Sequence, residues 1–125
     1  MTRVIIAGTR TFNNYRLLEK TIDEFVIGFN HGFEITVVSG GANGADKLGE
    51  QYARDRNYLI NRFEASWNVY GKSAGPIRNE KMAISADVLI AFWDGKSRGT
   101  KNMIELAKKY NLLMQVIKYW FIKQF

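Results

Sequence analysis

The chain has 125 residues, of which 46% are apolar and 24% charged, and its formal net charge at pH 7 is +6. These ordinary globular proportions predict a single domain over residues 1–125 that buries a core of its own. The sequence has no cysteine and one histidine, His31, which excludes disulfides, a thiol nucleophile and cysteine-based metal sites. We predict no metal site and interpret His31 as a surface residue in a helix-to-strand turn.

Apolar runs in this sequence are short. None approaches the roughly 20 consecutive apolar residues that cross a membrane, and the first residues run into a strand pattern instead of a signal peptide. We therefore expect a cytoplasmic protein with no membrane partner.

Strand-like and helix-like segments alternate along the chain. The short apolar runs, typical of strands buried on both faces, are residues 4–7, 35–38, 58–60, 88–93 and 112–117. Apolar residues spaced by three and four predict helices over residues 15–29, 45–53, 76–86 and 103–110, and a polar loop is expected over residues 63–75. This alternation predicts the α/β class: a Rossmann-like three-layer α/β/α domain with a mainly parallel sheet of about five strands.

Glycine-bearing turns follow the first, second and fourth predicted strands. They contain, in chain order, Gly8, Thr9 and Arg10, then Ser39, Gly40, Gly41, Ala42, Gly44 and Asp46, and then Trp93, Asp94, Ser97, Gly99 and Thr100. Ligands of parallel sheets bind beyond the carboxyl ends of the strands, where the strand order reverses. Glycines let backbone N–H groups approach an anion, and a following helix N-terminus adds partial positive charge. The turns predict a phosphate-binding site at this edge, the alternative being that the glycines only allow tight turns.

A basic segment strengthens the expectation of an anionic ligand. Residues 71–101 hold six basic and three acidic side chains, which gives a net charge of +3. Arg78 follows Pro76 at the start of a predicted helix, where its planar guanidinium could clamp a phosphate together with the adjacent Asn79. The alternative is a solvated basic face in which Arg78 pairs with a neighbouring acid.

Acidic and aromatic candidates each have two interpretations. Asp46 could cap its helix or contact a ribose hydroxyl, whereas Asp94 could bind a ribose or act as a base. Glu80 is the other acid near the site and a weaker candidate. Trp67 and Trp93 could stack on a base or anchor their loops to the core.

The motifs resemble those of the SLOG superfamily, and most closely its YspA/cpYpsA-related branch. The matching segments are residues 4–10, 39–46, 75–82 and 91–95, with Gly99 and Thr100, and the resemblance extends from Val4 to about Ala107. It implies a Rossmann-like fold and a nucleotide-type ligand.

A more distant resemblance is to nucleoside monophosphate phosphoribohydrolases. Arg78, Met82, Gly99 and Thr100 match part of their pattern, but Met103 stands where that pattern has a glutamate. Because hydrolysis of an N-glycosidic bond uses such a carboxylate, whether the chain is an enzyme stays open. Asp94 and Glu80 are the candidate catalytic residues.

Three functions are carried forward, in order of preference. The first is a non-catalytic binder of a phosphate-containing nucleotide or derivative, acting as a sensor or sequestering protein. The second is a hydrolase of a nucleotide or nucleotide-sugar bond. The third is a single-stranded DNA-binding accessory protein, because a distant SLOG relative loads recombination protein onto DNA. No cofactor is predicted beyond the nucleotide-type ligand itself.

The C-terminal segment, residues 118–125, holds four aromatic residues. An exposed segment this apolar is unusual on a monomer, so we predict a homo-oligomer, with a dimer preferred. Trp120 and Phe121 are expected at or near the contact. The alternative is that the segment folds back onto the chain's own core.

Overall fold

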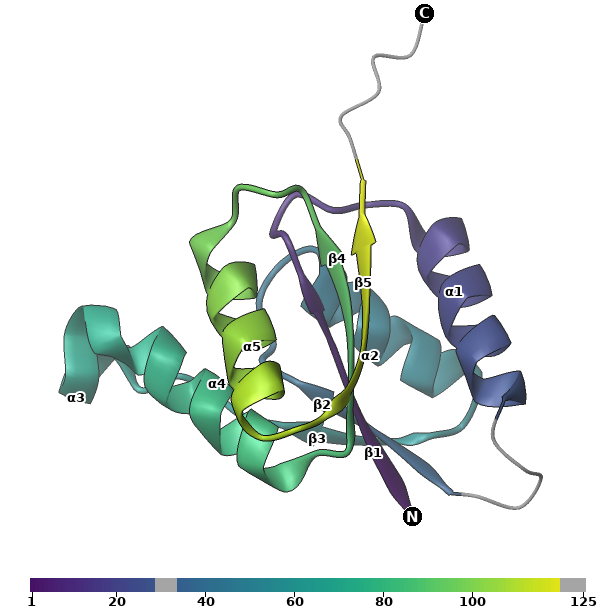
Figure 1. Ribbon diagram of the computed structural model, residues 1–125, viewed down its shortest axis with the longest axis horizontal. Coiled ribbons are helices and arrows are strands. Elements are labelled where there is room, and N and C mark those ends of the chain that lie inside the picture. The colour runs from purple at the N-terminus through teal and green to yellow at the C-terminus, as the bar shows by residue number, and fades with distance from the viewer. Residues whose placement is uncertain (29–33, 120–125) are drawn as a thin grey trace, which may run out of the picture.

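Five strands form one sheet in which every pairing is parallel (Figure 1). The computed structural model describes residues 1–28 and 34–119. The strands are β1 (Thr2–Gly8), β2 (Ile35–Ser39), β3 (Leu59–Arg62), β4 (Val88–Trp93) and β5 (Leu113–Lys118), in the spatial order β3-β2-β1-β4-β5. This confirms the predicted α/β, Rossmann-like class and the five-stranded sheet.

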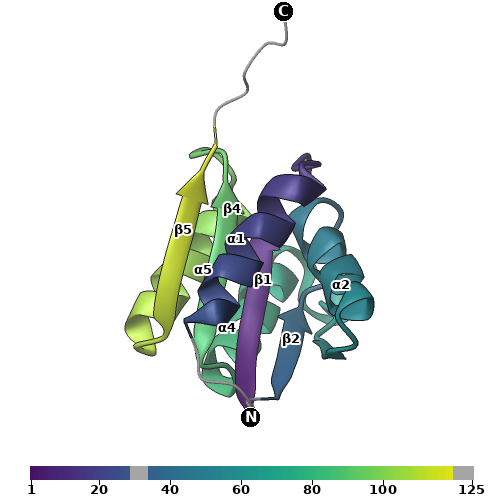
Figure 2. The ribbon, with the colours of Figure 1, turned by 90° about the vertical axis from the view of Figure 1, so that its right-hand side faces the viewer.

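Helices cover both faces of the sheet, as the three-layer prediction requires. The helices α1 (Tyr15–Ile27) and α2 (Ala45–Asp55) lie on one face, and α4 (Ala74–Ser85) and α5 (Arg98–Lys109) lie on the other (Figures 1 and 2). Within the two described ranges, no helix has both the length and the apolar character needed to cross a lipid bilayer.

Alternation along the central strands produces two apolar cores. In β1, Val4 and Ile6 point into the core shared with α1 and α2, while Ile5 and Ala7 point into the core shared with α4 and α5. Successive side chains of a strand face opposite sides of the sheet, so a strand covered on both faces must be apolar at every position. That is why β1, β2 and β4 appear in the sequence as continuous apolar runs.

The strand order reverses between β1 and β4. From β1 the chain passes to β2 and β3 on one side, then crosses to β4 and β5 on the other. The turns after β1 and β4 consequently run in opposite directions and leave a space between them, which is where ligands of such sheets bind.

Two predicted boundaries are wrong. The expected loop over residues 63–75 contains the short helix α3 (Trp67–Tyr70) and a 3₁₀ turn, η1 (Gly71–Ser73), and α4 begins at Ala74 instead of Pro76. The apolar stripe that marks the last long helix starts at Met103, and the structure shows that this helix, α5, begins at Arg98. The apolar stripe does not extend into the first turn of α5, because Gly99 and Thr100 of that turn line a cavity. Gly99 and Thr100 therefore lie inside a helix N-terminus.

Residues 29–33 and 120–125 lie outside the part of the chain that the structure describes. His31, Trp120 and Phe121 are among them, so the predicted dimer contact stays a prediction. The ring of Tyr119, the last described residue, packs against the ring of Phe12 with the two centroids 4.9 Å apart. Phe12 also stacks on Phe92. The beginning of the aromatic segment thus covers the chain's own core.

Gly44 shows how tightly the first two turns pack. Its φ is +82°, and a Cβ at this position would lie 2.3 Å from the carbonyl oxygen of Thr9. We expect Gly44→Ala to lower the free energy of unfolding by about 1–2 kcal/mol for the backbone and by a further 1–3 kcal/mol, roughly, for the displaced turn. Gly71→Ala is the matched control, because φ there is +55° but no described atom lies within 4 Å of the added Cβ. Urea denaturation measures both, and equal losses would contradict the close packing.

Candidate functional site

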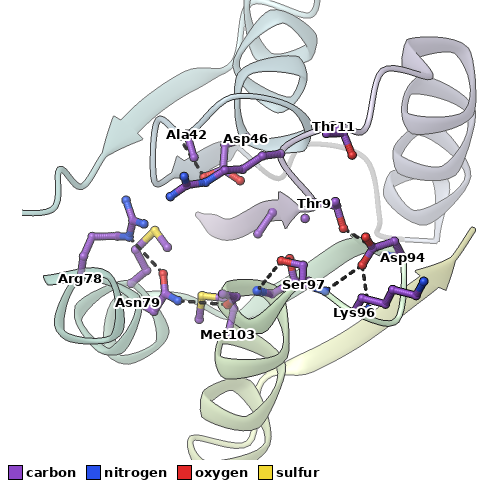
Figure 3. A pocket seen from close by; sticks show the side chains of 16 residues that line it. Thr9, Thr11, Ala42, Asp46, Arg78, Asn79, Asp94, Lys96, Ser97 and Met103 are labelled. Atoms are coloured by element: carbon purple, nitrogen blue, oxygen red, sulfur yellow. Dashed lines mark hydrogen bonds between the residues drawn. The ribbon is translucent and has the colours of Figure 1, made fainter. Parts of the chain in front are cut away.

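A cavity of about 460 Å³ opens at the carboxyl ends of β1 and β4 (Figure 3). This volume falls in the range of small-molecule sites, about 300–1,000 Å³. We call it the first cavity, and its lining residues are Ala7, Gly8, Thr9, Arg10, Thr11, Ala42, Asp46, Arg78, Asn79, Met82, Asp94, Lys96, Ser97, Gly99, Thr100 and Met103. It therefore occupies the switch point of the strand order.

The turn between β4 and α5 is held by Asp94. The Asp94 carboxylate accepts hydrogen bonds from the backbone N–H groups of Lys96 and Ser97, both at 2.8 Å. The Asp94 N–H donates to the Thr9 hydroxyl at 3.1 Å, which joins this turn to the one after β1. The two backbone bonds to the carboxylate keep the pKa of Asp94 below its usual value. Asp94 is thus an ionised acceptor, and a poor proton donor near neutral pH.

The N-terminus of α5 presents bare backbone to the first cavity. Ser97 caps the helix by accepting from the Thr100 N–H at 3.4 Å. The first turn of α5, which is wholly described, holds no acidic side chain. Asp94 binds the N–H of the capping residue Ser97 from outside the helix, so it offsets only part of the positive charge at this end. Gly99 is exposed, and a Cβ there would meet no described atom within 4 Å. Such a surface suits an anion.

Asn79 braces the same helix from α4. Its side-chain amide donates to the Gly99 carbonyl at 3.3 Å and to the Asn102 side chain at 2.9 Å, and its own oxygen accepts from Arg78 Nε at 3.0 Å. Asn79 is buried. It therefore connects the predicted phosphate clamp, Arg78, with the open helix end.

Asp46 compensates the N-terminus of α2, in contrast to the open end of α5. It is buried in the first turn of α2, and its carboxylate accepts from the Ala42 N–H at 3.3 Å. Burial raises the pKa of Asp46 to about 6, although backbone bonds from Ala42 and Gly8 and the charge of Arg78 oppose the rise. This carboxyl changes its charge close to neutral pH.

Arg78 lies half-buried beside Asp46, and the two side chains enclose Gly40. The Arg78 Nη1 donates to the Gly40 carbonyl at 2.6 Å and to the Phe63 carbonyl at 3.4 Å. A Cβ on Gly40 would lie 2.7 Å from Arg78 Nη1 and 2.8 Å from Asp46 Oδ2. A side chain at this position would therefore displace the ends of the Arg78 and Asp46 side chains. Burial, aided by the charge of Arg10, lowers the pKa of Arg78, and Asp46 opposes this.

The turn after β2 rests on a buried glutamate that sequence analysis did not single out. The Ser39 hydroxyl donates to Glu50 at 2.7 Å and accepts from the Gly41 N–H at 3.0 Å. Glu50 also forms a two-pronged ion pair with Arg62 at the end of β3. Burial opposes the ionisation of Glu50, but the bonds from Arg62 and Ser39 outweigh it and keep its pKa below the usual value.

A second cavity of about 420 Å³ adjoins the first and shares Arg10, Ala42 and Arg78 with it. Its lining residues are Arg10, Gly40, Gly41, Ala42, Asn43, Lys47, Arg62, Glu64, Ala65, Trp67 and Arg78. It lies over the ends of β2 and β3, with α3 contributing Trp67. Together the two cavities follow the carboxyl edge of the sheet.

The structure brings most of the predicted binding residues to these cavities. Gly8, Thr9, Arg10, Ala42, Asp46, Arg78, Asn79, Asp94, Ser97, Gly99 and Thr100 line the first, and Gly40, Gly41 and Trp67 line the second. In the described part of the chain, Ser39, Gly44 and Trp93 line neither cavity and instead shape the turns. Trp93 donates from its indole nitrogen to the Ser97 carbonyl at 3.0 Å, so its role is to anchor the loop.

Glu80 lies elsewhere, on the side of α4 that faces α5. It accepts from the Tyr110 hydroxyl at 2.7 Å and pairs with Lys109 at 3.3 Å. The described lining of both cavities does not include it. The structure therefore separates the two candidate catalytic acids, leaving Asp94 at the first cavity and Glu80 between helices.

Several lining residues were missed from the sequence. The cavity-lining residues that were not predicted are Ala7, Thr11, Asn43, Lys47, Arg62, Glu64, Ala65, Met82, Lys96 and Met103. Lys96 lies within a turn that the sequence did identify, so its proximity could have been inferred. Lys47 directly follows the glycine turn after β2, so its proximity could have been inferred in the same way. Arg62 follows no glycine motif, and its position depends on how β3 pairs with β2.

The sequence of this chain is similar to those of known proteins. The sequence profile of the YspA, cpYpsA-related SLOG family matches residues 2–70. The chain is also similar to the Gene 61 protein of Mycobacterium phage D29, with 32% identity over 115 residues that cover 87% of this chain and 90% of the phage protein.

Two solved structures share the fold. DNA processing protein A of Streptococcus pneumoniae superposes with a TM-score of 0.72 at 18% identity, over 98% of this chain and 52% of the pneumococcal one. DNA processing protein A of Helicobacter pylori, whose single-stranded DNA binding mode is described, gives 0.71 at 20% identity, over 98% of this chain and 68% of that one. This chain thus spans about half the length of the first of these proteins, and the likeness is one of fold.

The buried carboxyl of Asp46 makes stability depend on pH in a defined direction. Its pKa rises from 3.8 to about 6 on folding, so the folded state binds more protons than the unfolded state between these values. As the pH rises from about 4 to about 6, the contribution of Asp46 to the free energy of unfolding therefore falls, by about 3 kcal/mol in all.

Asp46→Asn supplies the reference for this measurement, because an amide does not titrate. Urea denaturation of both proteins across the window should show the wild type losing stability relative to Asp46→Asn as the pH rises. The other titrating groups cancel in the difference. A difference that stays constant with pH would mean that Asp46 titrates normally.

Proposed function

This chain belongs to the YspA, cpYpsA-related SLOG family, and on that premise we propose that it binds a phosphate-containing nucleotide or nucleotide derivative in the first cavity. We propose further that it holds this ligand without turning it over, as a sensor or sequestering protein. The observation that supports this most strongly is the N-terminus of α5, where the backbone around Gly99 is open and the first helical turn holds no acidic side chain.

The surrounding side chains suit the rest of a nucleotide. Arg10, Arg78 and Lys96 supply positive charge around the first cavity, which favours a phosphate over a neutral ligand. Asp46 and Asp94 line the same cavity and are acceptors of the kind that bind ribose hydroxyls. The phosphate would lie at α5, and the sugar would lie toward the two aspartates.

A binding role is favoured over hydrolysis by how the carboxylates are used. Met103, at the position of the phosphoribohydrolase glutamate, is buried and lines the first cavity. Among the described lining residues the carboxylates are Asp46 and Asp94, and both accept backbone hydrogen bonds that hold turns. A general acid or base must be within reach of the ligand and able to exchange a proton. The backbone bonds to Asp94 favour its ionised form and so make it a poor proton donor.

Single-stranded DNA binding is the second candidate, and the second cavity favours it. That cavity places an exposed tryptophan among basic side chains, a combination that suits stacked bases and a phosphate backbone. The Helicobacter pylori protein with the same fold is described as binding single-stranded DNA. An affinity that keeps rising with strand length would distinguish a DNA groove from a nucleotide pocket.

Gly99→Ala tests the phosphate position. The added methyl meets no described atom, and alanine favours a helix by about 1 kcal/mol over glycine, so the free protein should not lose stability. We expect the methyl to prevent close approach of the phosphate and to abolish the rise in Tm that 5′-mononucleotides of the common bases give the wild type.

Gly75→Ala is the matched control for this substitution. Gly75 also lies in the first turn of a helix, α4, and the described lining of both cavities does not include it. This variant should keep the full ligand-induced rise in Tm. Undiminished stabilisation of a folded Gly99→Ala protein would refute the placement of the phosphate at α5.

Mass spectrometry of the molecules released by denaturing the purified protein tests holding against turnover. We expect an intact nucleotide or nucleotide derivative, because the first cavity lacks the glutamate of the hydrolases. Incubation of that released compound with fresh protein should leave it unchanged. Recovery of a free base together with a sugar phosphate would instead favour the hydrolase.

A further inference from the structure

We propose that the second cavity is a second nucleotide subsite, so that the ligand of this protein is a dinucleotide with one unit in each cavity. This inference rests on the nucleotide-binding function proposed above and deepens it. It assigns chemistry to Lys47, Arg62 and Trp67, which the first cavity does not use.

Charge is distributed unequally between the two cavities. The first is lined by three cations and two carboxylates, namely Arg10, Arg78, Lys96, Asp46 and Asp94. The second is lined by four cations and one carboxylate, namely Arg10, Lys47, Arg62, Arg78 and Glu64. Glu50 pairs with Arg62, but the second cavity keeps three further cations against one carboxylate. A phosphate confined to the first cavity would leave this more cationic surface without a bound anion. A ligand with a second phosphate supplies one.

Arg10 and Arg78 line both cavities and so mark the boundary between them. Burial lowers the pKa of Arg78, and the positive charge of Arg10 adds to this effect while Asp46 opposes it. Two guanidinium groups that face one space are best stabilised by an anion placed between them. A phosphate that joins two nucleotide units would occupy this boundary and contact both arginines.

The far wall of the second cavity offers a surface for a base. Trp67 is 51% exposed although it lines the cavity, and α3 buries none of its four residues. A Cβ on Gly75 would lie 3.5 Å from the Trp67 ring, so the ring rests on the start of α4. The indole contacts α4 with its edge while about half of the residue stays exposed. A ring placed in this way is suited to stack on a base.

The cationic part of the second cavity around Arg62 is preorganised. Arg62 lies along the Gly41 turn, where a Cβ on Gly41 would be 3.0 Å from Arg62 Cδ. Glu50 binds its guanidinium through two atoms, and Ser39 in turn binds Glu50. This second cavity is therefore shaped before a ligand arrives, which reduces the entropy cost of binding.

The sizes of the cavities favour two units over one. They measure about 460 and 420 Å³ and are joined through shared residues. Two adjoining cavities of nearly equal volume, each with its own cationic wall, match a ligand made of two similar halves. A mononucleotide would fill one of them and leave the other to water.

Isothermal titration calorimetry tests the proposal with 5′-mononucleotides of the common bases and the matching 5′-phosphorylated homodinucleotides. We expect the best dinucleotide to bind at least about tenfold more tightly than its mononucleotide, as one further stacked base provides. Trp67→Ala should reduce dinucleotide affinity to that of the mononucleotide and leave mononucleotide affinity unchanged.

Tyr70→Ala is the matched control. Tyr70 is another exposed aromatic residue of α3, and the described lining of both cavities does not include it, so this variant should bind dinucleotides as the wild type does. Trp67→Phe keeps a ring and should retain part of the dinucleotide preference. If the effect of Trp67→Ala came only from a disturbed α3, a phenylalanine ring would not restore the preference. Partial retention in Trp67→Phe therefore indicates stacking.

Three results would overturn the proposal, and each has a distinct meaning. If mononucleotides bind but dinucleotides bind no better, the second subsite is refuted and the proposed function stands. If affinity continues to rise for an oligothymidylate long enough to leave both cavities, the edge of the sheet is a DNA groove. If no mononucleotide or dinucleotide binds, the proposed function and the second subsite fail together.

Discussion

The carboxyl edge of the sheet depends on the hydrogen bonds of one buried residue, Thr9. Its N–H donates to the Phe92 carbonyl at the end of β4, and its carbonyl accepts from the Ala45 N–H at the start of α2. Its hydroxyl accepts from the Asp94 N–H. The turns after β1, β2 and β4 thus meet at a single side chain and its backbone. Two of these bonds join the turn after β1 to β4 and the turn that follows it, and the third joins it to the start of α2, all through protein atoms.

This arrangement explains why glycines occur where they do. Gly44 and Gly8 lie where two turns contact each other, and a Cβ at either would come within 3 Å of neighbouring backbone or side-chain atoms. Gly99 lines the first cavity, where an added Cβ would meet no described atom within 4 Å. The first two glycines are needed for packing, whereas Gly99 leaves the backbone of α5 accessible. Similar glycine turns in the sequence therefore have different physical roles.

The acidic residues of the edge mostly support structure. Glu50 holds Ser39 and Arg62, Asp94 holds the turn before α5, and Asp46 holds the turn before α2. Glu50 lies behind Arg62, which lines the second cavity, whereas Asp46 and Asp94 line the first cavity themselves. Binding of an anion then requires little rearrangement, a property more useful for recognition than for proton transfer.

Fold class and the position of the first cavity were determined by the sequence itself. Continuous apolar runs require strands buried on both faces, and glycine turns after three of them must gather at one edge of a parallel sheet. Only the tertiary structure decided that Glu80 lies between helices, that Trp93 anchors a loop and that Arg62 and Lys47 line a second cavity. A pattern along the chain reports which face of an element is apolar. Which polar side chains then meet depends on strand order and helix packing, because these set distances between residues that are remote in sequence.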